Sequence, residues 1–152
     1  RKIPGLCDAK FARLGGIHRN TYINSPKLLS SDLSLISDQR IKFAGQITGV
    51  EGYVESASTG LLSGLLMYNK LKVREQRPPP KTTAMGSLIS YITRKDNVKD
   101  FQPMNINFGL FENIDIRDIR KEPKRMRDME KKIRIAQRAE IDLNKWLKSS
   151  FA

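Results

Sequence analysis

The chain has 152 residues, of which 28 are lysine or arginine and 16 are aspartate or glutamate, so its formal charge is +12. One cysteine excludes an internal disulfide scaffold, and the composition excludes collagen-like and low-complexity chains. The longest apolar run, Leu61–Tyr68, is far shorter than the roughly 20 residues that cross a bilayer, and the first residues lack a signal-peptide pattern. We therefore expect a soluble, cytoplasmic chain with no membrane partner.

The positive charge is spread along the chain. Residues 1–110 carry a net charge of +8 and residues 111–152 a net charge of +4, with basic residues densest at the end. This balance favours a polyanionic partner, because lysine and arginine release condensed counterions from phosphates. A solvated surface that keeps the protein in solution is the alternative, and no known nucleic-acid-binding motif decides between the two.

In chain order, residues 9–24 predict two short extended pieces around the glycine pair at 15–16. Alternating apolar and basic residues then predict a short strand over Ile41–Ala44. A glycine-rich turn at 45–52 leads into a helical pattern from about Gly52 to Lys70. The apolar stripe of this helix is expected to comprise Val54, Ala57, Leu61, Leu65 and Tyr68, widened by Leu62 and Leu66.

In the second half, three consecutive prolines predict an extended connector over residues 75–82. A short helix is expected at about Ala84–Ile92, and residues 95–110 show no clean period. A long helix is expected from about Pro123 to Lys148, with the proline in its first turn. Its apolar positions are Met126, Met129, Ile133, Ala136, Leu143 and Leu147, and Trp146 and Phe151 are expected to help it dock.

The turn at residues 45–52 is the sharpest signal of a binding site. Glycines serve where the backbone must approach a ligand or take a positive φ. A strand, a glycine turn and a helix together present backbone N–H groups and the positive end of a helix dipole to an anion. The glycine spacing of four and three matches neither a P-loop nor the dinucleotide fingerprint. On spacing alone, an ordinary strand–helix turn is the simpler interpretation.

A second candidate is the run of five hydrogen-bonding side chains at residues 18–22. In a strand, His18, Asn20 and Tyr22 would share one face, which could contact a base edge or a heterocycle. A structural hydrogen-bonding role for the single histidine is the alternative. Cys7 has no histidine near it in sequence, so we assign it no nucleophilic role, and one cysteine with one histidine cannot complete a metal site.

Four stretches together resemble a known family: IPGL (3–6), HRNTYINSP (18–26), FAGQITGVEGYVESASTGLLSG (43–64) and FQPMNINFGLF (101–111). In this order they are similar to the folate- and FAD-dependent tRNA (uracil-5-)-methyltransferase family, TrmFO. The related GidA-type flavoproteins share the IPGL and AGQ elements. The resemblance covers almost the whole chain but only the C-terminal third of the family's sequence, so we expect a fragment of a larger enzyme.

The resemblance implies an α/β fold: the C-terminal portion of a glutathione-reductase-type, Rossmann-like FAD domain, followed by a mainly helical segment. Residues 1–74 would hold returning strands, the flavin-contact turn and a helix. Residues 75–82 would form the connector, and residues 83–152 the helical segment with its basic last helix. Such a fragment would expose apolar edges, and pairing of two copies would cover them.

The implied reaction transfers a one-carbon unit from methylenetetrahydrofolate to C5 of a T-loop uridine in tRNA, with NAD(P)H as reductant and FAD as cofactor. The residues implied to contact FAD are Gly45, Gln46, Gly49, Val50, Glu51 and Gly52, the first two by the ribityl chain and the last three by the pyrimidine edge. Those implied to line the flavin or substrate pocket are His18, Arg19, Asn20 and Tyr22. No catalytic residue is expected here, because the family's catalytic cysteines and its GxGxxG are absent.

We therefore expect the fragment alone neither to hold FAD tightly nor to methylate RNA. Two alternatives stay open. A paralogue could use the same chemistry on a uridine of ribosomal RNA. A non-catalytic RNA-binding module could retain the basic surface without the flavin chemistry, and its RNA affinity would then fall steeply with salt.

Overall fold

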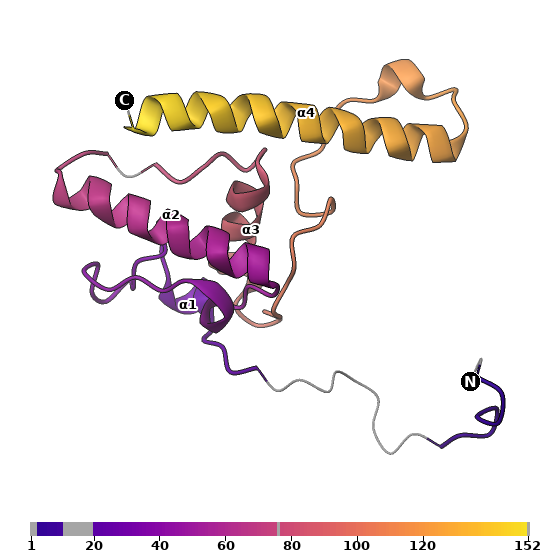
Figure 1. Cartoon of the computed structure of the whole chain (residues 1–152), viewed down its shortest axis with the longest axis horizontal. Helices are drawn as coiled ribbons and strands as arrows, with labels where there is room; N and C mark the ends of the chain where they lie inside the picture. The colour runs from indigo at the N-terminus through magenta and orange to yellow at the C-terminus, as the bar shows by residue number, and fades with distance from the viewer. Residues whose placement is uncertain (1–2, 11–19, 76, 152) are drawn as a thin grey trace.

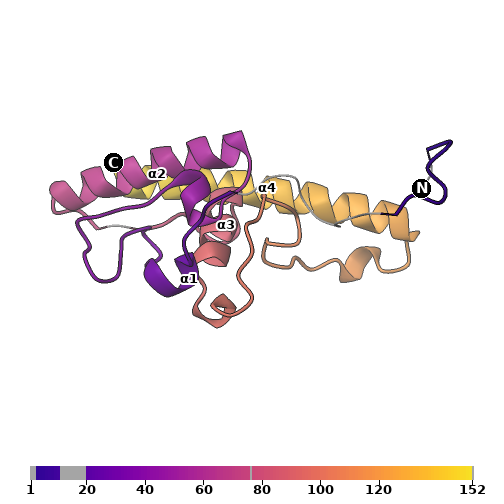
Figure 2. The ribbon, with the colours of Figure 1, turned by 90° about the horizontal axis from the view of Figure 1, so that it is seen from below.

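The computed structural model describes residues 3–10, 20–75 and 77–151. Its helices are α1 (Ser25–Leu28), α2 (Tyr53–Leu71), α3 (Ala84–Thr93) and α4 (Lys124–Phe151), with 3-10 turns at Gly45–Thr48, Lys95–Asn97 and Arg117–Ile119. In both ribbon views α4 runs alongside α2 and α3, and its N-terminal half extends beyond them (Figures 1 and 2). Within the described residues, no helix combines the length and the apolar character needed to cross a membrane.

The three longer helices begin where the sequence predicts them. α2 starts after Gly52, whose φ of 93° suits a glycine and separates the helix from the preceding turn. α3 starts after Thr83, whose side chain accepts a hydrogen bond from the Gly86 N–H at 3.1 Å. α4 starts directly after Pro123, whose carbonyl accepts the Met126 N–H at 2.9 Å. The expected helices are thus confirmed to within a few residues.

One apolar cluster joins the two halves of the chain. Its buried members are Leu33, Val50, Leu62, Leu66, Leu88, Ile89, Ile92, Phe101 and Trp146. The docking role expected for Trp146 is confirmed: the indole is buried, and its N–H donates to the Arg77 carbonyl at 2.8 Å. The side chain of Phe151 lies outside the described part. Burying each large apolar side chain contributes about 1.5–3 kcal/mol, so this cluster is the main reason α4 lies against α2 and α3.

The apolar stripe predicted for α2 is confirmed only at the residues that widen it. Val54 and Leu61 are 77% and 65% exposed, whereas Leu62 and Leu66 face the core. Two polar residues share the buried face with them. The Thr59 hydroxyl accepts the Gly45 N–H at 3.0 Å, and the Asn69 amide donates to a carbonyl of α4 at 3.2 Å. Because these polar groups find partners far away in sequence, this face can be buried although the opposite one is more apolar.

The stripe predicted for α4 is also wrong at Leu147, which is 40% exposed, and throughout its N-terminal half. Met126, Met129 and Ile133 are each more than 40% exposed, whereas Ile135 is almost fully buried. Leu143, at the other end of the helix, packs partly buried against the core, as expected. The reason is geometric: the N-terminal half of α4 lies beyond α2 and α3, so no core is available there to cover the row of methionines (Figure 1).

The strand predicted over Ile41–Ala44 is wrong as well. Lys42 makes one isolated antiparallel bridge with Ser34, and the described residues contain only isolated bridges. The partner segment is a tight loop that Leu33 turns with a φ of 66°, so it is too short to continue a ladder. The α/β, Rossmann-like class is therefore not confirmed: the described part of the chain is helical.

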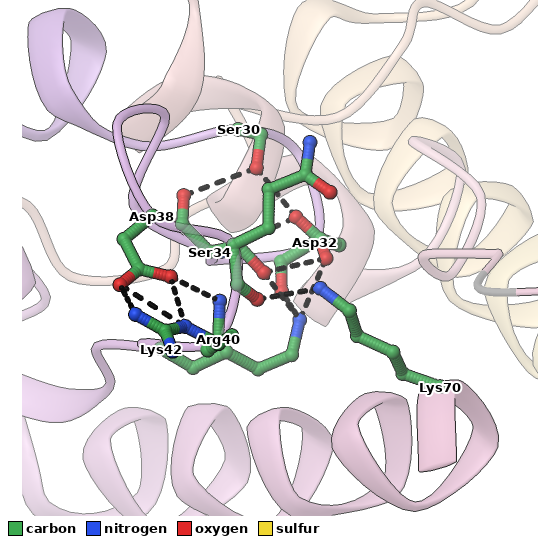
Figure 3. A network of polar contacts seen from close by, with 8 residues as sticks. Ser30, Asp32, Ser34, Asp38, Arg40, Lys42 and Lys70 are labelled. Carbon is green, nitrogen blue, oxygen red and sulfur yellow. Dashed lines mark hydrogen bonds and ion pairs between the residues drawn. The ribbon is translucent and has the colours of Figure 1, made fainter. Parts of the chain in front are cut away.

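A buried ion pair ties this loop to the segment that carries Lys42 (Figure 3). Lys42 is 4% exposed and donates to the Asp32 carboxylate, the Asp32 carbonyl and the Ser34 hydroxyl at 2.6, 2.7 and 2.9 Å. All three protons of the ammonium are thus used. Burial alone would raise the pKa of Asp32, but the hydrogen bonds from Lys42, Ser30 and Ser34 outweigh it and hold that pKa well below its usual value.

Candidate functional site

The glycine-rich turn predicted as a binding site is a 3-10 turn that leads into α2. Gly45 opens it with a φ of 72°, and its N–H donates to Thr59 on α2 at 3.0 Å. The Thr48 hydroxyl donates back to the Gly45 carbonyl at 2.7 Å, and the Gly49 N–H donates to the Gln46 carbonyl at 3.0 Å. These bonds close the turn on itself and leave the Gln46 side chain exposed at its tip.

The second half of the turn is anchored from behind. Gly49 takes a φ of 82°, and a Cβ there would overlap the Phe101 ring. Met104 pairs with Val50 in a parallel bridge: its N–H donates to the Gly49 carbonyl at 2.9 Å, and its carbonyl accepts the Glu51 N–H at 3.0 Å. Val50 is fully buried. Gly49, Val50 and the Glu51 amide therefore position the turn through contacts within the protein.

In front of the turn lies a hollow of about 360 Å³ with a largely polar lining. The residues that line it are Asn20, Gln46, Gly52, Tyr53 and Ser56. Gly52 is the N-cap of α2, and no side chain caps the first turn of this helix. The first N–H groups of a helix have no partner within it, so this end offers donors and the positive end of the helix dipole. The hollow can therefore hold a polar group, and the Glu55 carboxylate of the first helical turn, which lies beside Gly52, already supplies negative charge there.

The structure brings some of the predicted site residues together and separates others. Asn20, from the run at residues 18–22, lines the same hollow as Gln46 and Gly52 of the glycine-rich turn. Tyr22 instead lies edge-on to the Phe101 ring, with 6.0 Å between the centroids, on the side that anchors the turn. His18 and Arg19 lie outside the described residues. The face-sharing expected for the residue 18–22 run therefore stays a prediction.

Sequence analysis missed two residues of the hollow, Tyr53 and Ser56. Both follow from the helix start: once Gly52 is the N-cap, the next residue and the one a turn later flank the same end. Among the described residues, no group of three or more potential ligands could hold a metal ion. Cys7 is exposed and lies outside the hollow, and within the part of the chain that the structure describes its thiol hydrogen-bonds only to the adjacent Asp8.

Comparison with known proteins places the chain. Residues 1–75 match the family described as Glucose inhibited division protein A. Two proteins named methylenetetrahydrofolate–tRNA-(uracil-5-)-methyltransferase TrmFO are similar over 97% of this chain: 50% identical in Rhodospirillum rubrum and 53% identical in Hyphomonas neptunium. The chain is therefore similar to TrmFO proteins along almost all of its length. A further TrmFO, from Cereibacter sphaeroides, is 58% identical over 77% of this chain.

These matches cover only part of each TrmFO relative. The chain spans 31% of the length of the Rhodospirillum protein, 33% of the Hyphomonas protein and 26% of the Cereibacter protein. The resemblance stated from the four sequence stretches is confirmed. Because the chain spans about a third of these proteins, the activity in their name is a matter of proposal for this chain.

Proposed function

We propose that this chain is the part of a TrmFO-type tRNA (uracil-5-)-methyltransferase that contacts the flavin. The observation that carries the proposal is the meeting of Asn20, Gln46 and Gly52 at the uncapped start of α2. The name that the relatives share supports the reaction: one carbon passes from methylenetetrahydrofolate to C5 of a tRNA uridine. In such an enzyme NAD(P)H is the reductant, and bound FAD supplies the redox chemistry.

The residues around the hollow fit the polar edge of a flavin. That edge carries carbonyl acceptors and an N–H donor, and the hollow offers both kinds of partner. The amides of Asn20 and Gln46 each donate and accept, and the first turn of α2 adds N–H donors. The positive end of the α2 dipole also favours negative charge on whatever group lies against it. An apolar lining would not have met these requirements.

Each part of the turn then has its own role. Gln46, at the exposed tip, would bind and orient the ribityl chain, and the N–H groups of the first turn after Gly52 would face the pyrimidine edge. Gly49, Val50 and the Glu51 amide would act by positioning, because Phe101 and Met104 already occupy them. A substitution in that second group would displace the turn rather than remove a contact with the cofactor.

The exposed apolar row on α2 supports a longer polypeptide. Tyr53, Val54, Leu61 and Leu71 are each at least 65% exposed on one helix. A contiguous exposed apolar face marks a surface that another element covers. Because the chain spans about a third of its TrmFO relatives, we propose that the remainder of the enzyme packs against this row.

A glutamine pair tests the flavin contact in the full-length protein that carries this chain. Gln46→Ala should lower the amount of FAD that co-purifies, measured by flavin absorbance per protein. The matched control is Gln39→Ala, since Gln39 is exposed and, among the described residues, only its backbone carbonyl is engaged, by Lys70. Methyl transfer from labelled methylenetetrahydrofolate to an unmodified tRNA transcript is measured on the same samples. A full-length protein that carries no FAD and methylates no tRNA would overturn the proposal.

A further inference from the structure

A second hollow, of about 310 Å³, lies beside the N-terminal half of α4. The residues that line it are Ile114, Asp115, Ile116, Arg117, Arg120 and Arg127. We call residues 112–134 the arm. The arm comprises the segment before α4 and the first turns of the helix, and it extends beyond α2 and α3 in both ribbon views (Figures 1 and 2). The hollow is thus well separated from the glycine turn along the molecule.

Basic residues of α4 hold the arm in shape. Arg134 makes a two-bond contact with Asp118, at 2.9 and 2.6 Å, and a further bond to Glu130 at 2.8 Å. Arg138 donates to the carbonyls of Glu112 and Asn113. These contacts fold the 112–120 segment back on the helix. The three arginines that line the hollow, Arg117, Arg120 and Arg127, therefore come together because the segment folds back, and not because of their spacing in sequence.

Two of the three arginines of the hollow have guanidinium nitrogens without a partner among the described residues. Arg117 pairs with Asp115 through three side-chain hydrogen bonds, so one carboxylate in the lining is already neutralised. For the side chain of Arg120, the described residues provide no ion pair or hydrogen bond. Arg127 carries a buried guanidinium nitrogen, Nε, with no acceptor in the described part. Arg127 as a whole is half-buried and only this nitrogen is enclosed, so an anion in the hollow would give Nε an acceptor that the described residues do not provide.

The start of α4 also favours an anion in the hollow. Its first turn holds no acidic residue, and Lys124 and Arg125 lie there instead. Positive charge at the N-terminus of a helix is repelled by the helix dipole, whereas an anion at this end is favoured. The helix therefore carries charge of the unfavourable sign at the end that adjoins the hollow. Anion binding would turn this arrangement from unfavourable to favourable.

We propose that this hollow binds a phosphate group of the RNA backbone. The inference rests on the proposed function, which supplies a tRNA as the polyanion. Arginine is suited to such a contact because its planar guanidinium donates two parallel hydrogen bonds to phosphate oxygens. A phosphate contact fixes the position of the RNA without reading its sequence. The arm would thus bind the tRNA backbone away from the flavin. The hollow beside the glycine-rich turn would hold the flavin itself.

The test uses the full-length protein and an unmodified tRNA transcript. Arg120→Gln removes an exposed guanidinium without disturbing the core, and Arg120→Gln with Arg127→Gln removes both unpartnered groups. Each should weaken tRNA binding, the single variant by roughly tenfold. The slope of log affinity against log salt should flatten by about one for each lost phosphate contact. Lys148→Gln, at the far end of α4, is the matched loss of one charge and should change the affinity less than Arg120→Gln.

The outcomes separate this inference from the proposed function. If both arginine variants bind tRNA as tightly as the unaltered protein, the phosphate site is wrong, while FAD binding and methyl transfer still stand. If inorganic phosphate alone binds the unaltered protein tightly and the variants lose it without losing tRNA, the hollow is a small-anion site, and the RNA assignment is overturned. A protein that binds FAD and methylates tRNA, with binding weakened only in the arginine variants, supports both.

Discussion

Charged residues do different work in the two parts of the molecule. In the body, which we define as residues 20–110, Lys42 and Asp32 form a pair whose side chains are 4% and 18% exposed (Figure 3). In the arm, Arg134 and Asp118 pair at the same distance of 2.6 Å, with side chains 27% and 59% exposed. The same bond length thus joins a pair withdrawn from water in one region and a pair near the surface in the other.

The difference shows what each pair can contribute. Charges withdrawn from water interact strongly but cannot be separated without a large desolvation cost, so the Lys42 pair fixes its loop to the body. Charges near the surface are screened, so the Arg134 pair sets the shape of the arm while adding little to the stability of the fold. A surface that binds a polyanion benefits from the second arrangement, because its charges stay accessible.

The largest effect should come from breaking the buried pair. Lys42→Met keeps much of the side-chain volume but leaves the Asp32 carboxylate with only serine hydroxyls and an amide. Removal of one partner of a buried pair costs about 3 kcal/mol or more in the free energy of unfolding. Urea denaturation measures this. Arg40→Met, at the exposed Arg40–Asp38 pair, is the control, and a loss as large as that of Lys42→Met would contradict the comparison.

A glycine pair tests the packing of the body. A Cβ at Gly86 would overlap the carbonyl oxygens of Pro79 and Pro80, which belong to the connector before α3. Gly86→Ala should therefore lower the free energy of unfolding by about 2–3 kcal/mol, because backbone must move to make room. Gly60→Ala is the control: that glycine lies on exposed α2 with open space around it, so alanine should stabilise the helix by about 1 kcal/mol. Thermal unfolding of both variants measures the two shifts.

The sequence alone was enough to place the helices, because their ends carry local signals. Gly52, Thr83 and Pro123 each mark a helix start through their own backbone or side chain, independent of the rest of the chain. The inward faces were not predictable in this way. Leu62 faces the core and Leu61 faces out, although both lie in the same apolar run. Only the contacts of Thr59 and Asn69 with distant segments decide which side is buried.

The sites differ in the same respect. Gln46 and Gly52 could be predicted as site residues because the glycines around them indicate a turn. Asn20 could be predicted because it belongs to the polar run at residues 18–22. The arginine hollow could not be found, because Arg117 and Arg127 meet only after Arg134 folds the preceding segment onto α4. The strand expected at Ile41–Ala44 failed for a related reason, since a strand needs a partner that no local pattern supplies.

Acid should destabilise the body in a defined window. The pKa of Asp32 is held below its ordinary value, so below that value the unfolded chain binds a proton that the folded protein does not. The contribution of the pair is complete above the ordinary pKa of about 3.9 and is lost as the pH falls through the lowered one. The free energy of unfolding, followed by denaturation between pH 6 and about 2.5, should therefore decline more steeply in the unaltered protein than in Asp32→Asn. If the free energy of unfolding of Asp118→Asn depended on pH as weakly as that of Asp32→Asn, the arm would contribute as much as the body to this pH dependence.

The smallest effect on stability is expected in the arm. The effect there is therefore measured by local amide hydrogen exchange. Arg134→Gln removes the contacts with Asp118 and Glu130, the pKa of Asp118 returns toward its usual value, and the 112–120 segment loses its main tie to α4. Amide hydrogen exchange should speed up in residues 112–120 and stay unchanged in α2 and α3, while the thermal midpoint barely moves. Lys131→Gln, at a weaker 3.4 Å contact with Asn113, should change exchange less. If exchange in α2 accelerated together with the arm, the arm and the body would unfold as one unit, and the division of work between buried and exposed pairs would not hold.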